Sequence, residues 1–146
     1  MDKLDALITS LKELDTSIID TIKQVIQDNA VIIEEMNTVV QLDEEGVNRL
    51  GVKISSYAPY SPMTISIKRE KGQPTSRVTL RDTGEFHKSF YIEFHPDGFE
   101  IKASDWKANV LTKEYGPEIF GLTDENFNDL AINYIAPAIE DLFKSI

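Results

Sequence analysis

The sequence has no cysteine and only two histidines among its 146 residues. The first absence excludes disulfide scaffolds, thiol nucleophiles and cysteine-ligated metals, and the second makes a histidine-rich metal centre or a Ser–His–Asp triad a poor expectation. The longest uninterrupted apolar run is Ala30–Ile33, whereas a membrane-spanning helix needs about 20 apolar residues. The N-terminus also lacks the basic and then apolar layout of a secretory signal peptide. The sequence therefore predicts no membrane segment and no export by that route.

What the chain does contain is an ordinary globular composition, with 41% hydrophobic and 27% charged residues. Its formal net charge of -10 is unevenly distributed. Residues 1–45 carry a net charge of -8, residues 46–91 carry +5, and residues 92–146 carry -7. Opposite charges on separate segments of a small protein either pair within the folded chain or orient the protein toward its neighbours. Both interpretations are open at the level of the sequence.

An apolar residue recurs every seven positions in the first segment, at Leu4, Leu11, Ile18, Val25, Ile32 and Val39. Such spacing, with further apolar residues beside it, is typical of an amphipathic helix. No glycine or proline interrupts residues 2–45, so we predict one helix over residues 2–42, with two helices broken near Asp28-Asn29 as the alternative. The apolar face is expected to pack on the chain's own sheet or, alternatively, on a coiled-coil partner.

The rest of the chain predicts short helices around one β-hairpin. Aromatic and β-branched residues at 90–94 and 99–103 flank the turn Pro96-Asp97-Gly98, and the residues of one alternating face should form core. Brief strands are expected at 52–54 and 78–80. Helices are expected at 61–72, at 105–114, and from Thr123 to the end of the sequence. The alternating apolar residues of 61–72 would also fit a strand, and Pro137 should kink the last helix.

These elements predict an α+β fold. A long N-terminal helix or helix pair packs with a small antiparallel sheet, the central hairpin at about 90–103, and with a C-terminal helix. We expect an N-terminal helical segment at residues 1–45 and an α+β domain at residues 46–146, which together form one compact domain.

The sequence Asp82-Thr83-Gly84 has the form of the catalytic turn of aspartic proteases, in which two carboxylates share a proton. A chain with one such turn could act only as a homodimer. Arg81 opposes this interpretation, because its charge would lower the pKa that the paired carboxylates need raised. The structural interpretation is that Asp82 and Thr83 hydrogen-bond the backbone of a turn and cap a short helix at residues 84–89.

No other group of residues forms a recognisable catalytic site. His87 and His95 each follow a glutamate by two positions, but they fall at opposite ends of a predicted strand, so we expect a solvent-facing pair and not a metal site. No glycine-rich phosphate loop and no G-x-S-x-G motif is found. We therefore predict a protein that is not an enzyme and that uses no cofactor and no metal.

A basic stretch is the main candidate interface, and it contains Lys68, Arg69, Lys71, Arg77 and Arg81. Cations could contact phosphates, but no aromatic residues that would stack on bases lie within the stretch, and the protein is acidic overall. We expect it to face another protein, or DNA without reading its sequence.

The order of short motifs resembles the tail-completion and virion-morphogenesis proteins of tailed bacteriophages. In that family a P-x-D-T-G-x-L-x-x-S segment precedes the strands, and a Y-(x)n-E-x-G segment and a closing helix follow. The residues matching these segments are Asp82, Thr83, Gly84, Phe86, Ser89, Glu114 and Gly116. Phe86 replaces the aliphatic residue, and Leu80-Arg81 stands where the family has proline. Ile119–Leu122 and the Ala136-Pro137-Ala138 segment follow in order.

The resemblance implies a non-enzymatic structural protein of the virion, assembled in the host cytoplasm. Such a protein forms a homo-oligomeric ring at the head–tail junction, between the portal or connector and the tail proteins. The resemblance also implies non-specific contact with DNA in the channel and no contact with a membrane. The homodimeric aspartic protease using Asp82 and a partner-binding adaptor that works through the N-terminal helix are the alternatives.

Overall fold

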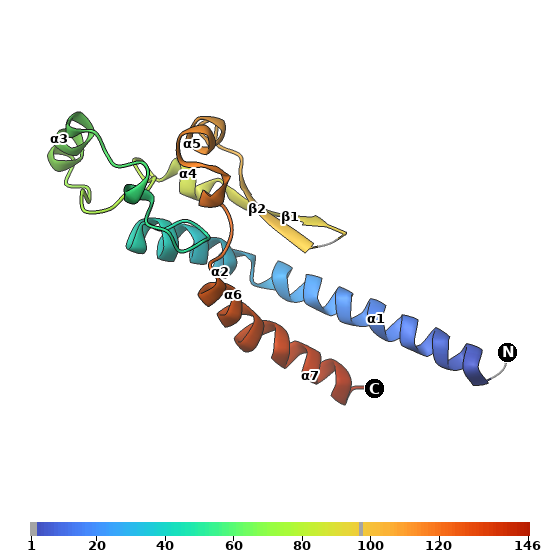
Figure 1. Ribbon diagram of the computed structural model, residues 1–146. Helices are drawn as coiled ribbons and strands as arrows, with labels where there is room; N and C mark the ends of the chain where they lie inside the picture. The colour runs from blue at the N-terminus through green and yellow to red at the C-terminus, as the bar shows by residue number, and fades with distance from the viewer. Residues whose placement is uncertain (1–2, 97) are drawn as a thin grey trace. The chain divides into compact units, whose positions relative to one another are not determined.

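The computed structural model describes residues 3–96 and 98–146, and confirms the predicted α+β fold (Figure 1). It is mostly helical, with one two-stranded antiparallel sheet. The elements in chain order are α1 (Lys3–Asp28), α2 (Ala30–Glu35), η1 (Met36–Glu45), η2 (Ile54–Ser56), α3 (Pro62–Glu70), α4 (Glu85–Lys88), β1 (Phe90–His95), β2 (Gly98–Ala103), α5 (Ala108–Tyr115), η3 (Pro117–Ile119), α6 (Asp124–Leu130), η4 (Ala131–Ile135) and α7 (Ala136–Lys144). In the described part of the chain, no helix is both long and apolar enough to span a bilayer.

The chain forms two compact units. The first, the helical unit, contains the residues up to Ala30 together with Asn128–Ile146, and the second, the hairpin unit, contains Val31–Phe127. This grouping differs from the predicted division into residues 1–45 and 46–146, because residues 31–45 are hydrogen-bonded to residues 119–126.

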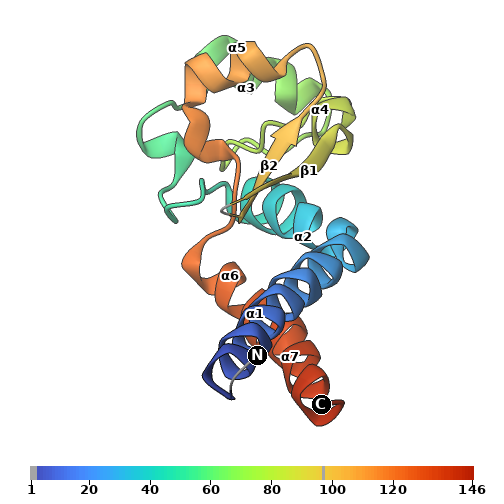
Figure 2. The same ribbon diagram turned by 90° about the vertical axis from the view of Figure 1, so that its right-hand side faces the viewer.

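In the helical unit, α1 packs along η4 and α7 (Figure 2). The helix predicted over residues 2–42 is interrupted at Asn29, the position named in the alternative of two helices broken near Asp28-Asn29. There the Val25 carbonyl accepts both the Asn29 side-chain amide, at 2.8 Å, and the Asn29 backbone N–H, at 3.1 Å. Before Pro137, which has no N–H, the helix widens into the π-helical η4, in which the Ala136 amide donates to the Ala131 carbonyl.

In the hairpin unit, β1 and β2 pair in the predicted antiparallel register, with Phe90 opposite Ala103, Ile92 opposite Ile101 and Phe94 opposite Phe99. Asp97 of the predicted turn lies outside the described residues. Phe90 and Ile101 are buried. The Phe90 ring packs on the rings of Phe86 and Phe120, at 5.1 and 5.3 Å between centroids, so the hairpin, α4 and the segment after η3 share one core.

Two buried amide side chains on η1 bind the segment that follows α5. Asn37 donates to the Ile119 carbonyl at 2.9 Å and accepts from the Gly121 amide at 2.8 Å. Gln41 donates to the Gly121 carbonyl at 2.9 Å, and its oxygen accepts from the Thr123 amide at 2.9 Å and from the Asn126 side chain at 2.8 Å. Both amides are fully buried, and each uses its donor and its acceptor.

The predicted strands at 52–54 and 78–80 are wrong. Lys53 forms one isolated bridge with Val47, and Ile54 begins the 3-10 helix η2. At residues 78–80 the Thr79 amide donates to the Tyr60 hydroxyl at 3.0 Å, and Leu80 has a positive φ of 55°. The Tyr60 hydroxyl thus binds the Thr79 amide in place of a neighbouring strand, and the left-handed conformation of Leu80 prevents a continuous strand.

The predicted helices at 61–72, at 105–114 and from Thr123 onward are confirmed with shifted ends, as α3, α5 and the run from α6 to α7. Ser61 caps α3 by accepting the Thr64 amide at 3.2 Å. Thr123 likewise accepts the Asn126 amide at 3.2 Å before α6. Hydroxyl caps read from sequence therefore located two of the helix starts.

We expect Gln41→Ala to lower the free energy of unfolding by about 2–4 kcal/mol, because it leaves the Gly121 carbonyl and the Thr123 amide without these partners in a buried site. Urea unfolding followed by circular dichroism measures the change. The matched control is Gln24→Ala, which removes one exposed hydrogen bond, to Asp28, and should cost about 0.5 kcal/mol or less. Equal losses in the two variants would contradict the role assigned to Gln41.

Candidate functional site

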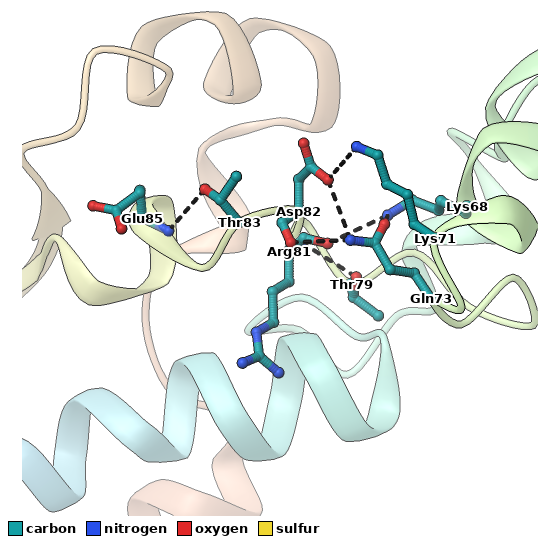
Figure 3. A network of polar contacts seen from close by, with 8 residues as sticks. All are labelled: Lys68, Lys71, Gln73, Thr79, Arg81, Asp82, Thr83 and Glu85. Carbon is teal, nitrogen blue, oxygen red and sulfur yellow. Dashed lines mark hydrogen bonds and ion pairs between the residues drawn. The ribbon is translucent and has the colours of Figure 1, made fainter.

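The turn Asp82-Thr83-Gly84 lies between residues 78–81 and α4, and it faces α3 (Figure 3). Thr83 accepts a hydrogen bond from the Glu85 amide at 3.4 Å, and the Gly84 carbonyl accepts the Lys88 amide at 3.0 Å. Gly84 has a φ of 91°, a left-handed conformation that a residue with a β-carbon adopts only under strain. Thr83 and Gly84 thus turn the chain into α4, whereas the Asp82 carboxylate points elsewhere.

The Asp82 carboxylate is directed toward Lys71, the C-cap residue of α3, and toward Gln73, two residues further along the chain. Its Oδ1 lies 2.8 Å from the Lys71 ammonium and accepts a second hydrogen bond from the Gln73 amide at 3.2 Å. Gln73 also donates to the Asp82 carbonyl at 3.0 Å. The hydrogen bonds from Lys71 and then Gln73 hold the pKa of Asp82 below its ordinary value. Asp82 is therefore a charged partner of Lys71 at neutral pH.

Lys68 is buried, with 9% of the residue exposed, directly behind this pair. Its ammonium donates to the Arg81 carbonyl at 3.3 Å and to the Gln73 side-chain oxygen at 3.4 Å, and it lies 5.0 Å from the centre of the Tyr60 ring. Within residues 3–96 and 98–146 it forms no ion pair with a carboxylate. The site thus holds a cation that is bound only by neutral oxygens and a π-face.

The candidate interface residues do not form one free basic surface. Arg77 donates to the Asp43 carbonyl, and Arg81, which leaves the turn toward η1 in Figure 3, lies 3.2 Å from the Asp43 carboxylate. Lys71 pairs with Asp82, and Lys68 is buried. Only Arg69, on α3, is exposed and without a hydrogen bond or ion pair to the rest of the described chain. Two of the five cations, Lys71 and Arg81, are therefore paired with carboxylates within the protein.

The two histidines have different surroundings and do not form a common site. His87 is half-buried, with Nε2 3.0 Å from the Thr79 carbonyl, and burial lowers its pKa below the ordinary value. It is not the solvent-facing residue that we expected. His95 lies at the end of β1, 3.4 Å from the Glu100 carboxylate on β2. No three histidine, aspartate or glutamate side chains of the described residues are grouped so that they could hold a metal ion.

A cavity of about 260 Å³ opens between α3, the Asp82 turn and α5. The sequence analysis missed its far wall, which Lys107, Leu111 and Tyr115 form. Their spacing of four residues places them on one face of α5, and this pattern was the available signal. Burial raises the pKa of Tyr115 to about 12, so its hydroxyl is protonated at neutral pH. The cavity combines lysines with apolar side chains.

Comparison with known proteins adds nothing to this description: no family model, no curated protein and no solved structure matches the chain.

We expect the protein to lose stability as the pH falls below 6.5. In the unfolded chain, His87 binds a proton near its ordinary pKa of 6.5. In the folded protein the pKa of His87 is lower, so below pH 6.5 the unfolded chain binds more protons than the folded one. Acid therefore favours unfolding. Urea unfolding on either side of that pH measures the effect. His87→Gln should weaken the dependence, and His95→Gln serves as the control. A dependence that disappears only in His95→Gln would contradict the assignment.

Proposed function

We propose that this protein is a non-enzymatic structural protein of a tailed bacteriophage virion, which forms a ring at the head–tail junction. Its partners would be further copies of itself and the portal, connector and tail proteins, with non-specific contact to DNA in the channel. It would assemble in the host cytoplasm and act in the virion. The proposal rests on the ordered motifs of the resemblance and on the surfaces described below.

The motif residues act in the fold of the hairpin unit, as expected of a structural family. Phe86 is buried against Phe90, and the Ser89 hydroxyl donates to the Phe86 carbonyl at 2.8 Å. Gly116, after the Glu114-Tyr115 pair, ends α5 with a φ of 88°. The motifs therefore support a shared fold more directly than they support a shared active site.

The observation that carries the proposal is the exposed apolar face on the N-terminal half of α1. Leu4, Leu7 and Leu11 are 63%, 55% and 53% exposed, although their spacing is that of a buried helix face. Contiguous apolar surface of this kind in a folded protein marks a contact with another protein. This exposed face is expected of a subunit whose apolar residues on α1 become buried when it assembles with other subunits.

The protease alternative is disfavoured by the surroundings of Asp82. A shared-proton pair of carboxylates needs at least one raised pKa, whereas Lys71 and Gln73 lower that of Asp82. The partner-binding adaptor is the second candidate function, because a single partner helix could cover the same α1 face. The two differ in what covers that face: further copies of this chain, or a different protein.

We expect the purified protein to form rings, or a mixture of monomer and ring, in light scattering and electron microscopy. Asp82→Asn should assemble equally well, and neither protein should cleave peptides at acidic pH. A chain that stays monomeric at every concentration and never joins phage particles would contradict the ring. If the protein cleaves peptides and Asp82→Asn abolishes that cleavage, the result would support the aspartic protease hypothesis instead.

The α1 face gives a second test. The double variant Leu7→Glu and Leu11→Glu should weaken assembly at least about tenfold, because it places charge on the apolar contact. Leu50→Glu is the matched control, since Leu50 is 69% exposed in the hairpin unit, outside α1. Equal losses in both variants, measured by sedimentation, would show that α1 has no special part in the contact.

A further inference from the structure

The cavity beside the Asp82 turn has the size of a site for one side chain. Its volume of about 260 Å³ is below the range of about 300–1,000 Å³ typical of small-molecule sites. Ile67, Leu80, Phe86 and Leu111 supply apolar wall, and Tyr60 and Tyr115 line it further. Pockets of this kind receive the anchor residue of a partner protein, most often a large apolar or aromatic side chain.

The charged residues of the cavity favour an acidic neighbour for that anchor. Lysines 68, 71 and 107 and Arg81 line the cavity, against a single carboxylate, that of Asp82. Asp82 already pairs with Lys71, and Arg81 pairs with Asp43. Lys68 and Lys107 have no carboxylate partner among the described residues, so an incoming carboxylate would meet two ammonium groups that no carboxylate neutralises, although that of Lys68 is buried and already hydrogen-bonded to two oxygens.

The C-terminal helix of this chain carries the required pair of groups. Phe143 on α7 is 51% exposed, and Glu140, three residues earlier, lies on the same helix face and is also exposed. We propose that α7 of a second copy docks here, with Phe143 in the apolar cavity and Glu140 at Lys68 and Lys107. This inference rests on the proposed ring and names its interface.

The geometry of such a contact suits a ring. The cavity belongs to the hairpin unit, and α7 belongs to the helical unit. A contact between two unlike patches of identical chains is heterologous, and heterologous contacts form a ring when the rotation from copy to copy closes. The acidic C-terminal segment and the basic middle of the sequence then meet between copies and not only within one.

Phe127 on α6 is the competing anchor, since it is 48% exposed and follows Asp124 by three residues. Asp124, however, lies in the first turn of α6, where the helix dipole already stabilises a carboxylate. Glu140 is the middle residue of α7 and lies toward the C-terminal end of the helical run from α6 to α7, where the dipole does not favour negative charge. A lysine partner therefore stabilises Glu140 more, and this difference selects Phe143.

The docking can be tested on the full chain with a synthetic peptide of residues 136–146. Trp106, the only tryptophan, reports binding, because its ring lies 5.7 Å from the Lys107 ammonium and the peptide contains no tryptophan. We expect saturable fluorescence changes, and at least about tenfold weaker binding for peptides with Phe143→Ala or Glu140→Lys. Lys107→Glu in the protein should restore binding of the Glu140→Lys peptide. Equal binding by all three peptides would overturn the proposal.

Assembly of full-length variants provides the second measurement. Phe143→Ala should shift the sedimentation equilibrium toward monomer, and Phe127→Ala should not; the reverse result would overturn the proposal. If rings form and neither Phe143→Ala nor Lys107→Glu affects them, the docking is wrong and the ring stands. If the full chain never assembles but the Lys107-dependent peptide contact is observed, the contact is right and the ring function is wrong.

Discussion

The hairpin unit depends on the hydrogen bonds of two buried amides, Asn37 and Gln41. In the segment that they bind, residues 119–123, these amides provide hydrogen-bond partners for the carbonyls of Ile119 and Gly121 and for the N–H groups of Gly121 and Thr123. An amide both donates and accepts, and two amides four residues apart on η1 match the carbonyls and N–H groups of an irregular chain. A carboxylate or a leucine at either position could not both donate to a carbonyl and accept from an N–H group. These bonds join residues 80 to 85 positions apart.

The same helix positions the Asp82 turn. Two residues after Gln41, Asp43 receives Arg77 through its carbonyl and Arg81 through its carboxylate. These contacts hold the chain on both sides of Leu80, whose left-handed backbone would be costly without such support. Gly46 allows the close approach, because a β-carbon there would lie 2.8 Å from the Arg77 β-carbon. Helix η1 thus positions both the 119–123 segment and the wall of the cavity.

The elements predicted from sequence are those whose signal is local. Ser61-Pro62 marks a helix start, the 90–94 and 99–103 runs mark a hairpin, and Asn29 can interrupt a helix through its own side chain. The strands at 52–54 and 78–80 failed because a strand exists only with a partner, and a tyrosine hydroxyl took that place at Thr79. The seven-residue apolar repeat did not show the π-helical winding of η1. In the site, the turn was visible, but Gln73 and the far wall on α5 were not.

The charge pattern of the sequence has a different meaning once the contacts are known. Charge segregation left open whether the basic middle pairs within the chain or with neighbours, and the structure shows that part of it pairs within the chain. Lys71, Arg77 and Arg81 are used internally, by Asp82 and Asp43. Exposed pairs of this kind are worth little each and are screened by salt, so they position the turn more than they stabilise it. Arg69 at the surface and Lys68 and Lys107 in the cavity have no carboxylate partner among the described residues. In the proposed assembly, electrostatic attraction would orient an approaching subunit, while burial of apolar surface, on α1 and in the cavity, would supply most of the binding free energy.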